Sequence, residues 1–348
     1  PVLPLSAVSK TPLAISTEIK NDVIFHKTAD NGITHINLYF SLTGIDKKEY
    51  GAISFLTNIL GELPTKSTAL SQLKQKLKST IGVIDYNVSA YAKPGENNLC
   101  HPYFVINFSF LNSKINDALS LVCEMINDTD FDSDETSILI EDIFYQSIYS
   151  VQESIISEGN RFARIKAASH VCASSYAEDM LEGYGFYKWL KRFDENFDEM
   201  YESFIAFVKK AQATVFNSSN VTVSVASPQL NDSVYEIFNM LNKNVDVEYP
   251  DYVELELDTT VKNEAIQIPG GVSYAALADN VYNYDIAPNG KMKALAQLMS
   301  YQYLWNEIRV LGGAYGCGFM VANNGNMMFH SYRDPNPENS KKVFKKGS

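Results

Sequence analysis

The sequence lacks the paired histidines of a zinc hydrolase. Such enzymes hold the metal with two histidines one helical turn apart, as in His-Glu-x-x-His or His-x-x-Glu-His. The chain of 348 residues has five histidines, and no two of them stand four positions apart. No metal site is therefore expected within this chain. The histidines are His26, His35, His101, His170 and His330.

Cysteine is also scarce, and its spacing excludes two further kinds of site. The four cysteines lie far apart, without the paired spacing of zinc or redox centres. We expect them to be free, mostly buried thiols of a protein in a reducing compartment. They are Cys100, Cys123, Cys172 and Cys317.

Long apolar runs and an excess of positive charge are missing as well. No stretch approaches the ~20 apolar residues that cross a bilayer, and residues 1–5 do not form a charged, apolar-cored leader, so no membrane segment is expected. Lys and Arg number 29 against 41 Asp and Glu, a net charge of −12. This balance argues against nucleic acid as a partner. It favours solubility, or the long-range attraction of basic ligands.

Two common catalytic motifs are absent or misplaced. The chain has no Gly-x-Ser-x-Gly nucleophile elbow, although a Ser/His/Asp site assembled from distant residues stays open. The glycines between residues 312 and 318 follow a predicted helix, whereas a phosphate cradle lies between a strand and the helix after it. A nucleotide site is therefore disfavoured.

The hydrophobic pattern predicts an α+β fold of two related two-layer units, each a mostly antiparallel sheet covered by helices. We place the first unit at residues 1–227. Alternating apolar residues indicate its strands, 3.6-residue periodicity indicates its helices, and Gly183 and Gly185 interrupt the last helical region. The expected strands are 32–42, 84–90, 103–111 and 221–225, and the expected helices are 47–63, 67–81, 112–126 and most of 133–216.

We place the second unit at residues 228–348. Like the first, it reads as strand, helix, paired strands and capped helix, but it has no long helical region afterwards, so we expect it to be incomplete. Its long helix carries an apolar face of Met292, Leu295, Leu298, Trp305 and Ile308. The expected helices are 231–242, 290–309 and one that begins at Asn339; the expected strands are 265–268, 272–278, 315–321 and 327–332.

Arg309 and Tyr315 stand six positions apart at the end of this long helix, separated by Gly312 and Gly313. In one interpretation Arg309 complements the helix dipole, the glycines cap the helix and Tyr315 packs in the sheet. In the other, the guanidinium and the phenol donate hydrogen bonds to a substrate carbonyl and to the oxyanion that grows from it. The residues alone leave both interpretations open.

Four motifs resemble the C-terminal half of pitrilysin/insulinase-family metallopeptidases, in the presequence-protease branch. They are Asp30-Asn-Gly-Ile-Thr34, Tyr39-Phe-Ser-Leu42, Arg309-x-x-Gly-Gly-Ala-Tyr-Gly and Ser331-Tyr-Arg-Asp-Pro335. The resemblance implies two halves, each of two α/β units, that close into a chamber for unfolded peptides. It implies that the N-terminal half carries a His-x-x-Glu-His zinc site, while Arg309 and Tyr315 hold the substrate backbone at that zinc. No role is implied for Arg333 or Asp334.

The missing zinc motif leaves three hypotheses for function. The first is the substrate-holding half of a zinc endopeptidase, with a peptide substrate and a zinc-bearing N-terminal half as partners, inactive by itself. The second is a non-catalytic peptide-binding or processing-partner subunit, and the third an assembly scaffold like the core subunits of respiratory complexes that share this fold. The expected location is the cytoplasm, or an organelle matrix in a eukaryote.

Overall fold

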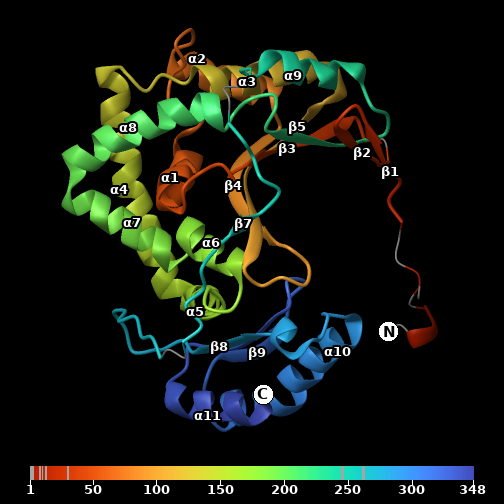
Figure 1. The fold of residues 1–348 in the computed structure, drawn as a ribbon, viewed down its shortest axis with the longest axis vertical. Coiled ribbons are helices and arrows are strands. Elements are labelled where there is room, and N and C mark those ends of the chain that lie inside the picture. The colour runs from red at the N-terminus through yellow and green to blue at the C-terminus, as the bar shows by residue number, and fades with distance from the viewer. Residues whose placement is uncertain are drawn as a thin grey trace.

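The computed structural model describes residues 4–7, 9, 11, 14–29, 31–243, 247–260 and 263–348. Asp30, which begins one of the four motifs, and residues 1–3, which entered the expectation about a leader, lie outside this part. The chain forms two sheets with helices packed on them, so the expected α+β class is confirmed (Figure 1).

The first sheet contains the four strands expected in the first unit and three short strands that the sequence did not reveal. Its order is β1-β2-β6-β3-β5-β4, and β7 adds to β5. All neighbours are antiparallel except β2 and β6. The strands are β1 (Thr17–Lys20), β2 (Val23–Lys27), β3 (Ile33–Ser41), β4 (Val83–Ala92), β5 (Leu99–Leu111), β6 (Val221–Ser227) and β7 (Val253–Glu254).

One face of this sheet is buried by helices. Ile36, Leu38 and Phe40 alternate along β3 and have no exposed surface, because they point into the main core. Figure 1 shows α1 enclosed by the later helices on this side. The helices are α1 (Tyr50–Ile59, preceded by η2, Lys47–Glu49), α2 (Leu70–Thr80), α3 (Ile115–Asp128, preceded by η3, Asn112–Lys114), α4 (Asp134–Ser157), α5 (Gly159–Ala168), α6 (Ala173–Glu182), α7 (Tyr184–Glu195) and α8 (Phe197–Thr214).

Two details of the helical region agree with the sequence. Ser133 caps α4, because its hydroxyl accepts a hydrogen bond from the N–H of Thr136. Gly183 separates α6 from α7, at the predicted interruption. The segment after Ser227 forms η4 (Asp232–Glu236) and α9 (Ile237–Met240) rather than one helix over 231–242. Ile237 and Leu255 of this segment pack in the first core, and the division of the chain after Ser227 stays a prediction.

The second sheet has the order β8-β10-β9 and is antiparallel. The expected strand at residues 265–268 is wrong, since these residues form no strand. The strand that pairs with one edge of β10 is β8, and Pro269 and Gly270 separate it from residues 265–268. Its elements are β8 (Ala276–Asn280), η5 (Val281–Tyr284), α10 (Gly290–Leu298), the π-helix η6 (Met299–Val310), β9 (Gly316–Val321), β10 (Asn326–Tyr332) and α11 (Pro337–Gly347).

The apolar face predicted for the long helix was only partly correct. Ile308 is buried, but Leu295 and Leu298 are 52% and 60% exposed. The helix instead turns Ala296 and Leu304 toward the sheet. The sequence carries two apolar stripes at helical spacing, so periodicity alone did not decide which of them faces the sheet. The second stripe leaves a row of exposed apolar side chains: Leu295, Leu298, Tyr301, Trp305, Val310 and Leu311.

Helices α5 and α6 join the two sheets. In Figure 1, α5 lies directly above β8. A guanidinium nitrogen of Arg164 lies 3.0 Å from the sulfur of Met320, and the amide of Asn326 donates to the hydroxyl of Ser175 over 2.8 Å. A cavity of about 290 Å³ remains at this joint, lined in part by Glu178.

Two titratable groups at the joint have strongly shifted pKa values. Burial, reinforced by the nearby Glu182, raises the pKa of Glu178 to about 7. Burial, with the positive charge of Arg164 in addition, lowers the pKa of His330 to about 4. The stability due to His330 is lost as the pH falls from about 6.5 toward 4, and the stability due to Glu178 is lost as the pH rises from about 4.5 toward 7.

We predict that Glu178→Gln stabilises the chain at neutral pH. The folded state binds the Glu178 proton more tightly than the unfolded state, so the substitution should have little effect below about pH 4.5. Above pH 7 it should raise the free energy of unfolding by about 3 kcal/mol. Urea unfolding across this pH range tests it, with Glu153→Gln on the exposed side of α4 as the control. A pH-independent difference between the two variants would contradict the prediction.

Candidate functional site

Arg309 lies at the end of η6, held by two rings and a backbone carbonyl. The carbon at the centre of its guanidinium is 4.2 Å from the ring centroid of Trp305 and 5.4 Å from that of Tyr315. One terminal nitrogen donates to the carbonyl oxygen of Tyr315 over 2.6 Å. These contacts fix the direction of a long cationic side chain that is only half-buried.

A glycine turn brings Tyr315 beside Arg309. Gly313 has a φ of +81°, a backbone conformation that glycine adopts without steric cost. Its N–H donates to the carbonyl of Arg309, and the N–H of Ala314 donates to the carbonyl of Ile308, each over 3.1 Å. The helix therefore ends at the expected glycines, and the chain reverses into β9 within a few residues.

The phenol of Tyr315 is not packed into the sheet. The residue is 65% exposed, although its backbone N–H donates to the carbonyl of Tyr332 over 3.1 Å. Its ring meets that of Tyr332 edge to face, with centroids 6.0 Å apart. The backbone is thus fixed by the sheet, while the ring remains at the surface beside the Arg309 guanidinium.

The motif at residues 331–335 supports this turn from the neighbouring strand, β10. Ser331 and Asp334 are almost wholly buried. The backbone of Asp334 exchanges two hydrogen bonds with that of Ser273, and one carboxylate oxygen accepts from the N–H of Asn336 over 2.8 Å. Arg333 adopts a φ of +45° and stacks its guanidinium 5.6 Å from the Tyr332 ring.

A nucleophilic thiol is not available at this site. Cys317 follows Tyr315 by two residues, and burial raises the pKa of its thiol to about 11 despite the opposing effect of Arg309. The chemistry that the site offers is therefore hydrogen-bond donation from the Arg309 guanidinium and the Tyr315 hydroxyl.

Two of the histidines make separate hydrogen-bonding contacts. Those of His101 and His170 are to the hydroxyl of Ser41 and the carboxylate of Glu264, each at 2.8 Å. Among the residues that the structure describes, no three His, Cys, Asp or Glu side chains gather as metal ligands. Within the same residues, no helix combines the length and the apolarity that a bilayer span requires.

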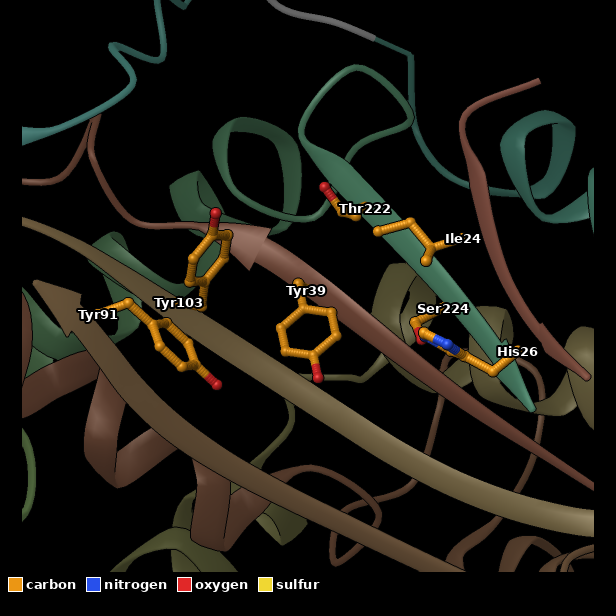
Figure 2. Close-up of a pocket in the computed structure, with 7 residues that line it drawn as sticks. All are labelled: Ile24, His26, Tyr39, Tyr91, Tyr103, Thr222 and Ser224. Carbon is orange, nitrogen blue, oxygen red and sulfur yellow. The ribbon is translucent and has the colours of Figure 1, made fainter. Parts of the chain in front are cut away.

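A second surface feature was not found from the sequence. Figure 2 shows a pocket on the first sheet, lined by three tyrosine rings from neighbouring strands. It lies on the face opposite the one that α1 covers, because Tyr39 alternates with the buried Leu38 and Phe40 along β3. Tyr39, Tyr91 and Tyr103 come from β3, β4 and β5, so only the pairing of these strands brings them together. Alternation within each strand was the one available signal, because it predicts which face each ring occupies.

Two protein families match the chain in order. A family of domains associated with subfamily C of the M16 peptidases matches residues 1–193, and the family described as "PreP C-terminal domain" matches residues 263–348. The second match includes Arg309, Tyr315 and Asp334.

Curated relatives match almost the whole chain. Protein HypA of Clostridium perfringens is 26% identical over 99% of this chain and 35% of its own length. The mitochondrial presequence protease of Gibberella zeae is 23% identical over 97% of this chain and 34% of its own length. The chain thus spans about a third of the length of these relatives.

Solved structures share the fold at low sequence identity. A peptidase M16 inactive domain from Pseudomonas fluorescens is 16% identical, with a TM-score of 0.58 over 96% of this chain and 79% of its own. A protease from Helicobacter pylori is 13% identical, with a TM-score of 0.59 over 95% of this chain and 78% of its own. The first family covers more than half of the chain, and the chain therefore belongs to the M16, or pitrilysin, peptidase family, in which it corresponds to the C-terminal half of a presequence-protease-like member.

Proposed function

We propose that this chain is the substrate-holding half of a zinc endopeptidase that degrades unfolded peptides in a closed chamber. The observation that carries the proposal is the placement of the Arg309 guanidinium beside the exposed Tyr315 phenol, 5.4 Å from its ring. The chain belongs to a peptidase family but spans only about a third of the length of its relatives. This supports the proposal that another part of the enzyme supplies the rest of the site.

The described residues of this chain do not fit a zinc ion, because no cluster of suitable ligands is found among them. We assign the zinc to the N-terminal half, in the same polypeptide or in a separate subunit. The role left to this chain is to bind and orient the peptide. Its negative charge favours basic peptides through long-range attraction.

Arg309 and Tyr315 can perform this role by donating hydrogen bonds. A guanidinium has five N–H donors, and the bond to the Tyr315 carbonyl uses one of them. The remaining donors can bind a backbone carbonyl of the peptide, which sets its register. The phenol hydroxyl can donate to the oxygen on which negative charge develops. Because both side chains are held by the turn, little reorganisation is needed when the peptide binds.

The compartment and an alternative function follow from the same relatives. Several relatives are mitochondrial presequence proteases, which supports an organelle matrix for a eukaryotic protein, and the cytoplasm is the proposal otherwise. One solved neighbour is described as an inactive domain of a peptidase. That description supports the second candidate function, a peptide-binding or processing-partner subunit without its own zinc.

We predict that the purified chain alone does not hydrolyse peptides. Its described residues offer hydrogen-bond donors but no metal cluster, and the Cys317 thiol is protonated at neutral pH. A quenched fluorescent peptide incubated with the chain, with and without a chelator, measures this. Chelator-sensitive cleavage that follows the chain through purification would contradict the assignment of zinc to another half.

In the enzyme assembled with its zinc-bearing half, Arg309→Ala and Tyr315→Phe should each lower kcat/KM by roughly ten- to a thousandfold. Losses of this size accompany removal of an oxyanion donor. Arg309→Lys should not restore the rate, because an ammonium cannot reproduce the planar donor set. Steady-state kinetics on one peptide test this, and unchanged kinetics in both variants would remove the two residues from the site.

The two substitutions should differ in their effect on folding of the chain alone. Arg309→Ala removes a cation–π contact and a hydrogen bond, and should lower the free energy of unfolding by about 1 kcal/mol. Tyr315→Phe keeps the ring and should stay within about 0.5 kcal/mol of the original chain. Chemical denaturation measures both. A large loss of stability in Tyr315→Phe would mean that its hydroxyl has a structural role.

A further inference from the structure

The face of the first sheet opposite α1 carries a pocket that is not lined by Arg309 or Tyr315. Its volume is about 350 Å³, within the range of small-ligand sites. Tyr39, Tyr91 and Tyr103 form one side of it, and Figure 2 shows that the other side comes from β2 and β6. The remaining lining residues are Ile24, His26, Thr222 and Ser224.

The three tyrosine rings form a partly open aromatic cluster. Tyr103 is central, with ring centroids 5.8 Å from Tyr39 and 5.9 Å from Tyr91, both in edge-to-face geometry. Tyr91 is 53% exposed, so part of the cluster remains uncovered. Edge-to-face packing leaves ring faces and edges on which a further aromatic ring can pack in the same manner.

The floor of the cluster is apolar. Val105 is paired in register with Tyr39 and therefore lies on the same face, yet it is only 3% exposed. His101 stacks on the other side of Tyr103, with ring centroids 4.0 Å apart and planes inclined by 3°. Tyr103 is thus held between rings, and its orientation is fixed before any ligand binds.

The rim of the pocket is polar, with hydroxyl groups and one imidazole. None of the seven lining residues is Asp, Glu, Lys or Arg. Burial raises the pKa of the Tyr39 and Tyr103 phenols, so both stay protonated and can donate hydrogen bonds. The imidazole of His26 is held at one nitrogen by the hydroxyl of Thr17, at 2.9 Å.

The same face continues as a row of small polar side chains. Asn37 is paired with Asn107 on one side and with Ser224 on the other, so the three lie side by side next to the pocket. Amide and hydroxyl groups can donate to and accept from a peptide backbone. Such a row suits an extended peptide better than a large subunit interface, which is more apolar. The absence of cations among the lining residues disfavours a phosphate-bearing ligand.

We propose that this pocket binds an aromatic side chain of an extended, unfolded peptide. The tyrosine cluster receives the ring, and the neighbouring Asn and Ser side chains hydrogen-bond the peptide backbone. Basic residues that flank the ring are attracted by the chain's net charge of −12. The inference rests on the proposed function for its kind of ligand, but it concerns a different sheet from the one that carries Arg309 and Tyr315.

Peptide binding to the chain alone tests the pocket. Fluorescence anisotropy with labelled decapeptides that differ at one central position, Phe, Ala, Lys or Glu, should show the tightest binding for Phe. Tyr91→Ala and Tyr103→Ala should each weaken the Phe peptide roughly tenfold and leave the Ala peptide unchanged. Tyr149→Ala, which removes a 68% exposed tyrosine on α4, is the matched control and should change nothing. Tyr91→Leu serves if an alanine variant unfolds, since it keeps an apolar side chain while removing the ring.

Several outcomes would overturn the pocket while leaving the proposed function intact. Equal affinity for the Phe, Ala and Lys peptides would remove the aromatic preference. If Tyr315→Ala abolished binding of the Phe peptide and Tyr91→Ala did not, the aromatic preference would be assigned to the second sheet. If Tyr91→Ala changed the sedimentation coefficient and left the peptide affinity unchanged, the tyrosine face would be an interface between copies of the chain rather than a peptide site. Conversely, unchanged cleavage kinetics in the Arg309 and Tyr315 variants would reject the proposed function without touching the pocket.

Discussion

The packing of α5 against the second sheet is the contact on which the arrangement of the chain depends. It requires close approach at the first residue of α5, where a Cβ added to Gly159 would lie 2.2 Å from the ring of Tyr274. The hydroxyl of Tyr274 in turn donates to the carbonyl of Ile156 over 2.7 Å. A glycine, an aromatic ring and a hydrogen bond thus add to the contacts of Arg164 and Asn326 at this joint. The joint sets how the Arg309 turn lies relative to the tyrosine face.

The two features for which we propose peptide binding lie on different sheets. The Arg309 and Tyr315 pair lies in a turn at a helix end, where a cation and a phenol can reach a peptide carbonyl. The tyrosine cluster lies on a sheet face, where only side-chain packing and backbone hydrogen bonds are available. If one peptide contacts both, the second sheet would hold its reacting carbonyl. The first sheet would hold an aromatic side chain farther along the peptide. Binding energy from that remote contact can then contribute to orientation at the reacting bond.

The sequence predicted the elements with strong internal periodicity and failed where tertiary context decides. Strand β3, helix α1, the β9 and β10 hairpin and the glycine-ended helix all followed from local pattern. Strands β1, β2 and β7 are short, and they exist because a neighbouring strand is present. The wrong strand at residues 265–268 has an apolar pattern but no partner beside it among the described residues.

The candidate site shows the same limit. Arg309 and Tyr315 were found because they are close in sequence and joined by a distinctive glycine turn. The proximity of Tyr39 to Tyr91 and Tyr103 was not predictable, since it depends on the register of β3 beside β5, and a long stretch of chain separates these two strands. Whether Arg309 and Tyr315 act on substrate stays a prediction that kinetics must test.

The exposed apolar row along α10 and η6 has a practical consequence. Leu295, Leu298 and Tyr301 are each more than half exposed, and they lie on adjacent helical turns. An exposed apolar surface of this kind promotes self-association of the chain as its concentration rises. Handling the chain by itself would thus call for dilute samples or mild detergent, even though its high negative charge opposes precipitation.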